Sequence, residues 1–316
     1  MFGFSLSRGY TSELCPRAPL RNCAPERGRL KPGGASPRAS DTPLSVDAEK
    51  SARAARDCLA EAAREAGRLA LAFFRPGAAT SARIKAKAGG SPVTEADLAV
   101  DALLKARLSA AFPEAGWLSE ETADDAERLE RRALIIVDPI DGTRAFAAGD
   151  PRWTISAAIA IDGRPLAGVV HAPAFGETYA AARGAGAKLD GATLQASTRF
   201  DANLKAAGPR LVLQSMEAKL GAKVEISPRA PSLAYRLCMA ARGAIHFAVA
   251  AENSHDWDIA AADLILEEAG ARLVDAAGER LIYNQPHVRR GALLATPEAL
   301  APRLLDAFRA AIGARA

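Results

Sequence analysis

Four consecutive aliphatic residues, Leu134-Ile-Ile-Val137, lead directly into the segment Asp138-Pro-Ile-Asp-Gly-Thr143. A short aliphatic run bounded by turn-forming residues is typical of a strand that is buried on both faces, which requires a layered fold. Such a strand would deliver two carboxylates, a hydroxyl and a glycine to its carboxyl end, where hard oxygen ligands and a phosphate-binding turn can meet. An ordinary turn explains the same residues, so this segment by itself leaves both interpretations open.

The residues around this strand have the periodicities of regular elements. Apolar residues recur at helical spacing before Pro76, and a second helix is expected to begin at Thr94 and to end before Pro113. Alternating segments separated by Asp-Gly pairs, which favour hairpin turns, predict an antiparallel sheet in the middle of the chain. The predicted elements are helices over 46–74 and 94–111 and strands over 134–137, 154–161, 166–170 and 178–182.

Beyond residue 205 the pattern alternates between strand and helix. The predicted elements are helices over 232–241, 258–269 and 297–312 and strands over 211–213, 244–249, 271–274 and 292–295. This alternation predicts a layered mixture of α and β structure, of the α+β or α/β class. It also suggests an amino-terminal α+β part over 45–204 and a carboxyl-terminal α/β part over 205–316.

The first 44 residues differ from the rest in composition. Residues 1–40 hold seven basic and two acidic side chains, and this charge of +5 leaves −1 on the other 276 residues of a chain whose total is +4. Frequent prolines and a lack of apolar periodicity predict a disordered basic extension over 1–44, either without function or a targeting segment. The rest of the chain has no basic face for nucleic acid and no apolar run long enough for a membrane helix, so a cytoplasmic protein is expected.

Three other acidic segments each have an ordinary structural explanation. Thr94-Glu-Ala-Asp97 fits a helix-capping box, and Ser119-Glu-Glu121 could lie in an exposed loop. Asp258 follows Trp257 at a predicted helix start, where an acid complements the helix dipole. These explanations, together with an ordinary turn at 138–143, must all hold if the chain has no acidic site.

Considered together, the acidic segments resemble the inositol monophosphatase superfamily of Mg²⁺-dependent, lithium-sensitive phosphatases. The resemblance covers residues 50–313, and the order and spacing of four motifs make it specific. The motifs are Ser91-Pro-Val-Thr-Glu-Ala-Asp97, Leu118-Ser-Glu-Glu121, Asp138-Pro-Ile-Asp-Gly-Thr143 and Trp257-Asp-Ile-Ala-Ala-Ala-Asp-Leu-Ile-Leu-Glu-Glu-Ala-Gly270. The resemblance implies a layered αβαβα sandwich with a metal site between its amino-terminal and carboxyl-terminal parts.

The resemblance also implies two Mg²⁺ ions and the residues that hold them. Glu120, Asp138 and the Ile140 carbonyl would hold one ion, and Asp138, Asp141 and Asp258 would hold the second. Asp138 would therefore bridge both ions. All of these groups are hard oxygen donors, which Mg²⁺ prefers.

The remaining roles that the resemblance implies concern the reaction. Asp97 and Thr143 would position and deprotonate the water that attacks phosphorus in line, and the amides of Gly142 and Thr143 would bind phosphate oxygens. The resemblance also allows a third, more weakly bound ion, which Asp97 and Glu120 would hold. The implied partner is a small phosphorylated metabolite, and a homodimer is left open.

The motifs indicate more than one substrate. Ser91-Pro-Val-Thr94 and Leu118-Ser-Glu-Glu121 look like the bacterial 3'(2'),5'-bisphosphate nucleotidase branch, which converts adenosine 3',5'-bisphosphate to AMP and phosphate. Asp138-Pro-Ile-Asp141 looks instead like inositol-1-monophosphatases or histidinol-phosphatases, and the nucleotidase is modestly favoured. The candidate substrate contacts are Ser232, Arg236, Glu252 and His255.

Two other classes of protein fit less well. In a haloacid-dehalogenase-type phosphatase the nucleophilic aspartate lies two residues before a second aspartate, whereas Asp138 and Asp141 are three residues apart. A non-catalytic metal-binding member of the same superfamily would have lost a ligand, and every acid that the resemblance requires is present. Mg²⁺-dependent release of phosphate from a generic monoester would separate an enzyme from a binding protein.

Overall fold

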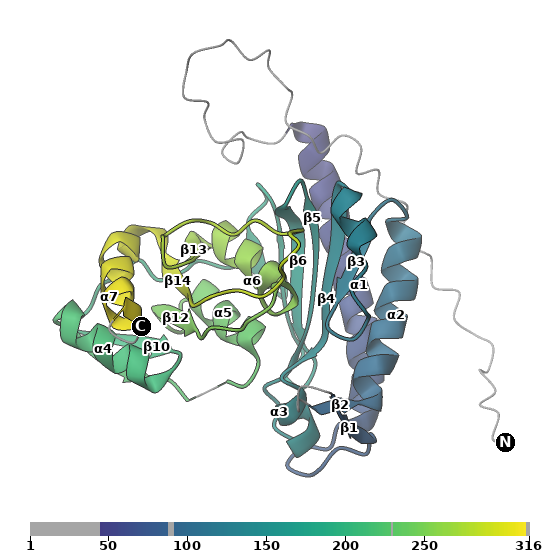
Figure 1. The fold of residues 1–316 in the computed structure, drawn as a ribbon, viewed down its shortest axis with the longest axis horizontal. Helices are drawn as coiled ribbons and strands as arrows, with labels where there is room; N and C mark the ends of the chain where they lie inside the picture. Colours follow the sequence, from purple (N-terminus) through teal and green to yellow (C-terminus); the bar gives the residue numbers. More distant parts are fainter. Residues whose placement is uncertain (1–44, 88–91, 229, 314–316) are drawn as a thin grey trace.

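A computed structural model describes residues 45–87, 92–228 and 230–313. Helices and sheets alternate in five layers, in the order helix, sheet, helix, sheet, helix (Figure 1). This arrangement confirms the αβαβα sandwich that the sequence resemblance implies. The predicted basic extension over 1–44 and the first residue of the Ser91–Asp97 motif lie outside the described residues.

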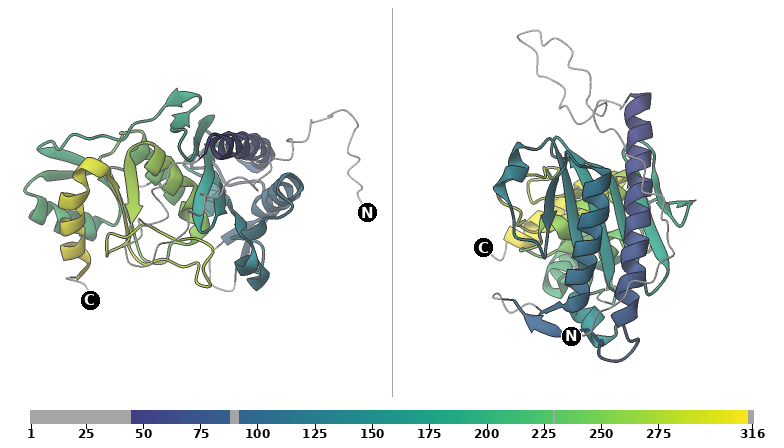
Figure 2. Two further views of the ribbon diagram at one scale, coloured as in Figure 1. Left: turned by 90° about the horizontal axis from the view of Figure 1, so that it is seen from above. Right: turned by 90° about the vertical axis from the view of Figure 1, so that its right-hand side faces the viewer.

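The first outer layer consists of helices α1 (Val46–Phe73) and α2 (Glu95–Ala111), which lie side by side on one face of the larger sheet (Figure 2, right). The inner face of α1 is mainly alanine, which lets the helix pack closely on the strands. A hairpin of β1 (Ile84–Ala86) and β2 (Pro92–Thr94) joins the two helices. None of the helices in the described ranges is long and apolar enough to span a bilayer.

The larger sheet has the strand order β3-β4-β5-β6-β7-β8-β9. β3 runs parallel to β4 and every other neighbouring pair is antiparallel, as expected for the predicted hairpins. The 3₁₀ helix η2 (Ala126–Glu130) precedes β4, and helix α3 (Thr143–Ala148) follows it. The strands are β3 (Gly116–Ser119), β4 (Ala133–Asp141), β5 (Thr154–Ile161), β6 (Arg164–Ala172), β7 (Glu177–Ala182), β8 (Ala187–Leu189) and β9 (Ala192–Thr193).

The middle layer consists of α5 (Leu233–Ala241) and α6 (Asp256–Glu268), which separate the larger sheet from the smaller one (Figure 1). The smaller sheet has the order β11-β10-β12-β14-β13, in which β10 runs parallel to β11 and β12 and the other pairs are antiparallel. Helices α4 and α7 and the 3₁₀ helix η3 complete the outer layer. Their bounds, and those of the strands, are β10 (Asn203–Ala207), α4 (Arg210–Leu220), β11 (Lys223–Ile226), β12 (Phe247–Ala250), β13 (Ala271–Val274), β14 (Leu293–Pro297), η3 (Glu298–Leu300) and α7 (Ala301–Gly313).

The prediction of a strand over 211–213 is wrong, because these residues belong to helix α4. A run of three apolar residues fits a strand or a helix equally well, and only a longer window separates the two. Leu213, Met216 and Leu220 continue the buried face of the helix at helical spacing. The strand of this region is β10, which lies a few residues earlier and was not predicted.

Gly168 permits close contact between β6 and α6. A Cβ atom at this position would lie 2.7 Å from the carbonyl oxygen of Ala261 and 3.0 Å from its Cα. Both neighbouring atoms belong to the helix backbone, so they cannot move aside without a shift of α6. The absence of a side chain at Gly168 therefore sets the distance of α6 from the sheet.

We expect Gly168→Ala to lower the free energy of unfolding by about 1–3 kcal/mol, the usual cost of overpacking a core. Urea unfolding followed by circular dichroism would measure the change. Gly291→Ala is the matched control, because a Cβ at Gly291 would meet no atom within 4 Å. Equal stability of the two variants would contradict the close packing of α6 on β6.

Candidate active site

A bulge at the end of β4 turns two aspartates to the same side of the sheet. Asp138 pairs with Ser156 and Asp141 pairs with Thr154, so the two β4 residues between the aspartates oppose the single residue Ile155 of β5. In a regular strand, residues three apart point to opposite faces, and one extra residue reverses this alternation. The bulge therefore lets Asp138 and Asp141 act as a pair, although their spacing alone would separate them.

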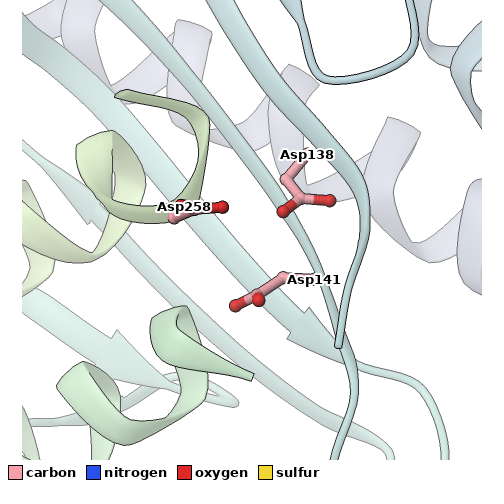
Figure 3. A group of neighbouring side chains, drawn as sticks. All are labelled: Asp138, Asp141 and Asp258. Carbon is pink, nitrogen blue, oxygen red and sulfur yellow. The ribbon is translucent and has the colours of Figure 1, made fainter. Parts of the chain in front are cut away.

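The third carboxylate comes from the first turn of α6. The His255 backbone N–H donates to Asp258 Oδ2 at 2.7 Å, which caps the helix and orients the side chain. One carboxylate oxygen from each of Asp138, Asp141 and Asp258 lies within 4.8 Å of the others. Figure 3 shows the three side chains directed toward a common space between β4 and the start of α6.

Glu120 lies beside this cluster because β3 and β4 are parallel. Ser119 is the partner of Val137, and the Glu120 N–H donates to the Val137 carbonyl at 3.3 Å. Parallel strands end at the same edge of a sheet, so Glu120 comes next to Asp138. Lys87 Nζ forms ion pairs with Glu120 Oε1 at 2.8 Å and with Glu121 Oε1 at 2.7 Å.

Asp97 and Thr143 contact each other directly. The Thr143 Oγ1 atom lies 3.1 Å from Asp97 Oδ1 and 3.1 Å from the Ile140 carbonyl oxygen. The other oxygen of Asp97 accepts the Thr94 N–H at 2.8 Å in a complete capping box. Asp97 therefore caps α2 with one oxygen and contacts Thr143 with the other, so the capping role leaves one oxygen free for the predicted catalytic role, which stays a prediction.

Burial and mutual repulsion make the carboxylates of this region hard to ionise together. Burial raises the pKa of Asp258 to about 8, and the neighbouring Asp141 adds to the shift. The pKa of Asp138 is raised well above its ordinary value by burial and then by Glu120, Asp141 and Asp258. Burial also raises the pKa of Asp97. A divalent cation would reverse these shifts, because its charge favours the ionised carboxylates.

The donors present fit a metal ion. Asp138 Oδ1 is buried and has no hydrogen-bond partner among the described residues, which is costly for a polar atom. A cation held with Asp141 and Asp258 would satisfy this oxygen. Three carboxylates converge there, and oxygen ligands of this kind suit Mg²⁺, Ca²⁺ or Mn²⁺.

Two of the candidate substrate contacts lie at the start of α5, next to Asp141. Ser232 is fully buried, and its hydroxyl donates to Asp141 Oδ2 at 2.7 Å, as does the Ala234 N–H. Ser232 therefore holds Asp141 in place in this arrangement. Burial raises the pKa of Asp141 overall, and the hydrogen bonds from Ser232 and Ala234 and the charge of partly buried Arg236 act against this shift. The predicted contact of either residue with substrate stays a prediction.

The other two candidates lie before α6. Glu252 is exposed, in the loop that precedes left-handed Asn253. The ring of His255 stacks on Trp257 with centroids 4.6 Å apart, and it is close enough to Glu120 for that carboxylate to raise the pKa of the imidazole. Burial has the larger effect and lowers the pKa of His255 overall. His255 thus lies near the carboxylates. Glu252 has no hydrogen bond or ion pair with the other residues that the structure describes.

Sequence analysis missed two residues that act on the Glu120 region. Lys87 carries no signal in the sequence, since its partners Glu120 and Glu121 lie more than thirty residues away. Asp101 on α2 accepts hydrogen bonds from Ser119 and Thr122. Its position one helical turn after Asp97 puts both aspartates on one face of α2, and this spacing was the available signal.

We expect Asp138→Asn to stabilise the metal-free protein by about 1 kcal/mol at pH 8, because it removes one charge from a repelling cluster. Folding raises the pKa of Asp138, so the wild-type protein loses stability as pH rises and this carboxyl ionises. The gain from the substitution should therefore grow with pH. Thermal unfolding in chelator between pH 6 and 8 would measure it, with Mg²⁺ added to each protein as the control. A less stable metal-free variant at pH 8 would contradict the repulsion.

A five-layered αβαβα fold with carboxylates gathered between its sheets defines a known class of phosphatases. Residues 55–312 match the model of the inositol monophosphatase family, and the chain belongs to this family. Its members are phosphatases that hydrolyse phosphate monoesters. The sequence resemblance is therefore confirmed at the level of the family.

The relatives have more than one activity in their names. A histidinol-phosphatase of Chlorobaculum parvum is 39% identical over 43% of this chain and 51% of its own length. The 3'(2'),5'-bisphosphate nucleotidase CysQ of Aggregatibacter actinomycetemcomitans is 29% identical over 71% of this chain and 86% of its own length. An inositol-1-monophosphatase of Mesorhizobium japonicum is 30% identical over 81% of this chain and 97% of its own length.

A solved structure has the same fold. The extragenic suppressor protein suhB of Bartonella henselae superimposes with a TM-score of 0.68 and 26% identity, over 80% of this chain and 97% of its own. The match supports the family assignment and leaves the substrate undecided.

Proposed function

We propose that this protein is a Mg²⁺-dependent phosphate monoester hydrolase in which water attacks phosphorus directly. The observation that carries the proposal is the convergence of Asp138, Asp141 and Asp258 within 4.8 Å, next to the Asp97–Thr143 pair. A cluster of carboxylates alone could be structural. A cluster with a separate acid and hydroxyl beside it has the parts that metal-assisted hydrolysis requires.

The carboxylates of Asp138, Asp141 and Asp258 would hold one Mg²⁺, and Glu120, Asp138 and the Ile140 carbonyl would hold another. When bound, Mg²⁺ supplies positive charge that favours ionised water and stabilises the phosphate and the leaving oxygen. Ser232 and Ala234 keep one oxygen of Asp141 occupied and so orient its other oxygen. The ion pair between Lys87 and Glu120 would compete with the binding of Mg²⁺ by this glutamate.

Asp97 would take the proton from the attacking water. Its Oδ1 atom takes no part in the capping box and lies 3.1 Å from Thr143 Oγ1, so this oxygen would accept the proton. Thr143 Oγ1 lies between Asp97 and the Ile140 carbonyl and can orient the water toward the acid. Gly142 has a left-handed φ of 95°, which lets the chain turn into α3 and expose its first amides to a phosphate.

For the substrate we propose a 3',5'-bisphosphate nucleotide. The proposed contact for a second phosphate is Arg236, which lies on α5 one helical turn after Ser232, the residue that donates to Asp141. The relative named as a bisphosphate nucleotidase aligns over most of both chains. The alternatives are an inositol 1-phosphate and histidinol phosphate. Histidinol phosphate is supported by the 39% identity to a histidinol-phosphatase, although that alignment covers only 43% of this chain.

The substrate is tested by comparing kcat/KM on adenosine 3',5'-bisphosphate, inositol 1-phosphate and histidinol phosphate in Mg²⁺. We expect the nucleotide to react at least about tenfold faster, the effect of one differential charged contact. Arg236→Gln should remove this preference and leave turnover of the smaller substrates nearly unchanged. A preference for histidinol phosphate would contradict the nucleotidase proposal, and no hydrolysis of any of the three would contradict the proposed reaction.

A further inference from the structure

Asp101 is a buried carboxylate close to the site, and the mechanism above gives it no role. It lies on α2, one turn after Asp97, and is 8% exposed. Asp97 contacts Thr143, whereas Asp101 contacts the last residue of β3 and the loop that follows this strand. The two aspartates thus connect one face of α2 to two different parts of the site.

The two oxygens of Asp101 hold both sides of the Glu120-Glu121 pair. The Ser119 hydroxyl donates to Oδ1 at 2.5 Å, and the Thr122 hydroxyl donates to Oδ2 at 2.7 Å. Ser119 Oγ in turn accepts the Glu121 N–H at 3.3 Å. One carboxylate therefore fixes the residues before and after the two glutamates and closes the segment into a tight turn.

The hydrogen bonds of Asp101 to Ser119 and Thr122, called the bracket below, constrain the backbone around Glu120. Lys87 contacts the side chain of Glu120 instead. The Glu120 N–H is also bonded to Val137, the residue before Asp138. The backbone of Glu120 is thus tied both to β4 and, through its neighbours, to α2. Lys87 can exchange its contact with the Glu120 carboxylate without any change in these backbone bonds.

A role in the stability of the fold does not by itself explain a buried aspartate at position 101. Asp97, Glu120 and Glu121 already concentrate negative charge around this segment. An apolar residue would fill the same space without the cost of desolvating a charge. A carboxylate can, however, accept two hydrogen bonds in fixed directions, which an apolar side chain cannot.

We infer that Asp101 is a positioning residue that sets the affinity of the site for Mg²⁺ by fixing the turn that carries Glu120. Residues that orient a metal ligand from behind typically change metal affinity or activity by 10–100-fold when they are removed. The inference rests on the proposed function, because it assumes that Glu120 binds Mg²⁺. Asp101 itself touches neither substrate nor ion.

The test is the Mg²⁺ dissociation constant of the full-length, metal-free protein, measured by isothermal titration calorimetry. We expect Asp101→Ala to raise this constant by about 10–100-fold. Asp101→Asn should stay within about threefold of the wild type, because an amide can accept from Ser119 and donate to the Thr122 oxygen. Kinetics should agree, with a higher Mg²⁺ requirement and an unchanged KM for substrate at saturating Mg²⁺.

Two further variants keep the test decisive. Thr122→Val removes one arm of the bracket and little volume, and it should raise the Mg²⁺ dissociation constant by at least about threefold even if Asp101→Ala does not fold. Asp263→Ala is the matched control, since Asp263 on α6 accepts from the Tyr283 hydroxyl at 2.8 Å and is outside the carboxylate cluster. It should lower the melting temperature without changing Mg²⁺ affinity.

Wild-type Mg²⁺ affinity in Asp101→Ala, or in Thr122→Val where the first variant is unfolded, would overturn the inference and leave Asp101 with a purely structural role. That result would not affect the proposed function. Failure of the wild-type protein to bind Mg²⁺ would overturn both. A selective loss of affinity in the bracket variants, with the Asp263→Ala control unchanged, supports the inference.

Discussion

Asp138→Asn should retain less than about a tenth of wild-type turnover at any Mg²⁺ concentration, because the residue would ligate both ions. The hydrogen bonding of its carboxylate differs from that of the neighbouring aspartates. Asp141 Oδ2 is bonded to Ser232 and Ala234, and Asp258 Oδ2 to the His255 N–H, whereas Asp138 Oδ1 has no partner among the described residues. The substitution replaces this oxygen, or the other one, by an amide nitrogen that cannot bind a cation.

Asp258→Asn is the matched comparison, since it would remove a ligand from one ion only. Its activity should therefore be partly restored by excess Mg²⁺, whereas that of Asp138→Asn should not. Steady-state rates over a wide Mg²⁺ range would measure both, and circular dichroism would establish that both variants fold. Turnover of Asp138→Asn above about a tenth of the wild-type value would show that the site is assigned incorrectly.

The second large effect is expected at the proposed general base. Asp97→Asn should slow the chemical step by about two to four orders of magnitude and spare substrate binding, as is usual when a general base is removed. Helix α2 should still form, because the N-cap residue Thr94 is unchanged and the amide oxygen of asparagine can still accept the Thr94 N–H in the capping box. Single-turnover rates and circular dichroism would measure the two effects separately. Normal turnover in this variant would leave Asp97 with its capping role alone.

Isotope labelling distinguishes direct attack by water from a covalent route. If water attacks phosphorus, one turnover with excess enzyme in ¹⁸O-water places one solvent oxygen in the released phosphate. In an aspartyl-phosphate mechanism the first turnover would instead transfer an aspartate oxygen, and acid quench would trap phosphate on Asp138 or Asp141. A trapped phosphoenzyme would reject the proposed mechanism, whatever the rate of Asp97→Asn.

The comparison of sequence and structure separates local signals from long-range ones. The capping box at Thr94 and the buried strand that leads into Asp138 were both predicted, since each depends on residues a few positions apart. The strand over 211–213 was wrong because three apolar residues do not establish a period. The parallel pairing of β3 with β4, which brings Glu120 beside Asp138, has no periodic signal at all. Lys87 and Asp101 were missed because their partners are distant in the chain.

The amino-acid sequence by itself determined the main helices, the buried strand and the four acidic motifs, because helix caps and apolar periods are local properties. Only the tertiary structure decided that these motifs form one site. The bulge in β4 turns Asp138 and Asp141 to one side, and the packing of α6 against Gly168 brings Asp258 to them from more than a hundred residues away. The structure also showed that Asp101 accepts hydrogen bonds from Ser119 and Thr122, on either side of Glu120 and Glu121. Side chains so far apart in sequence meet only when whole layers pack, and no short stretch of residues carries that information.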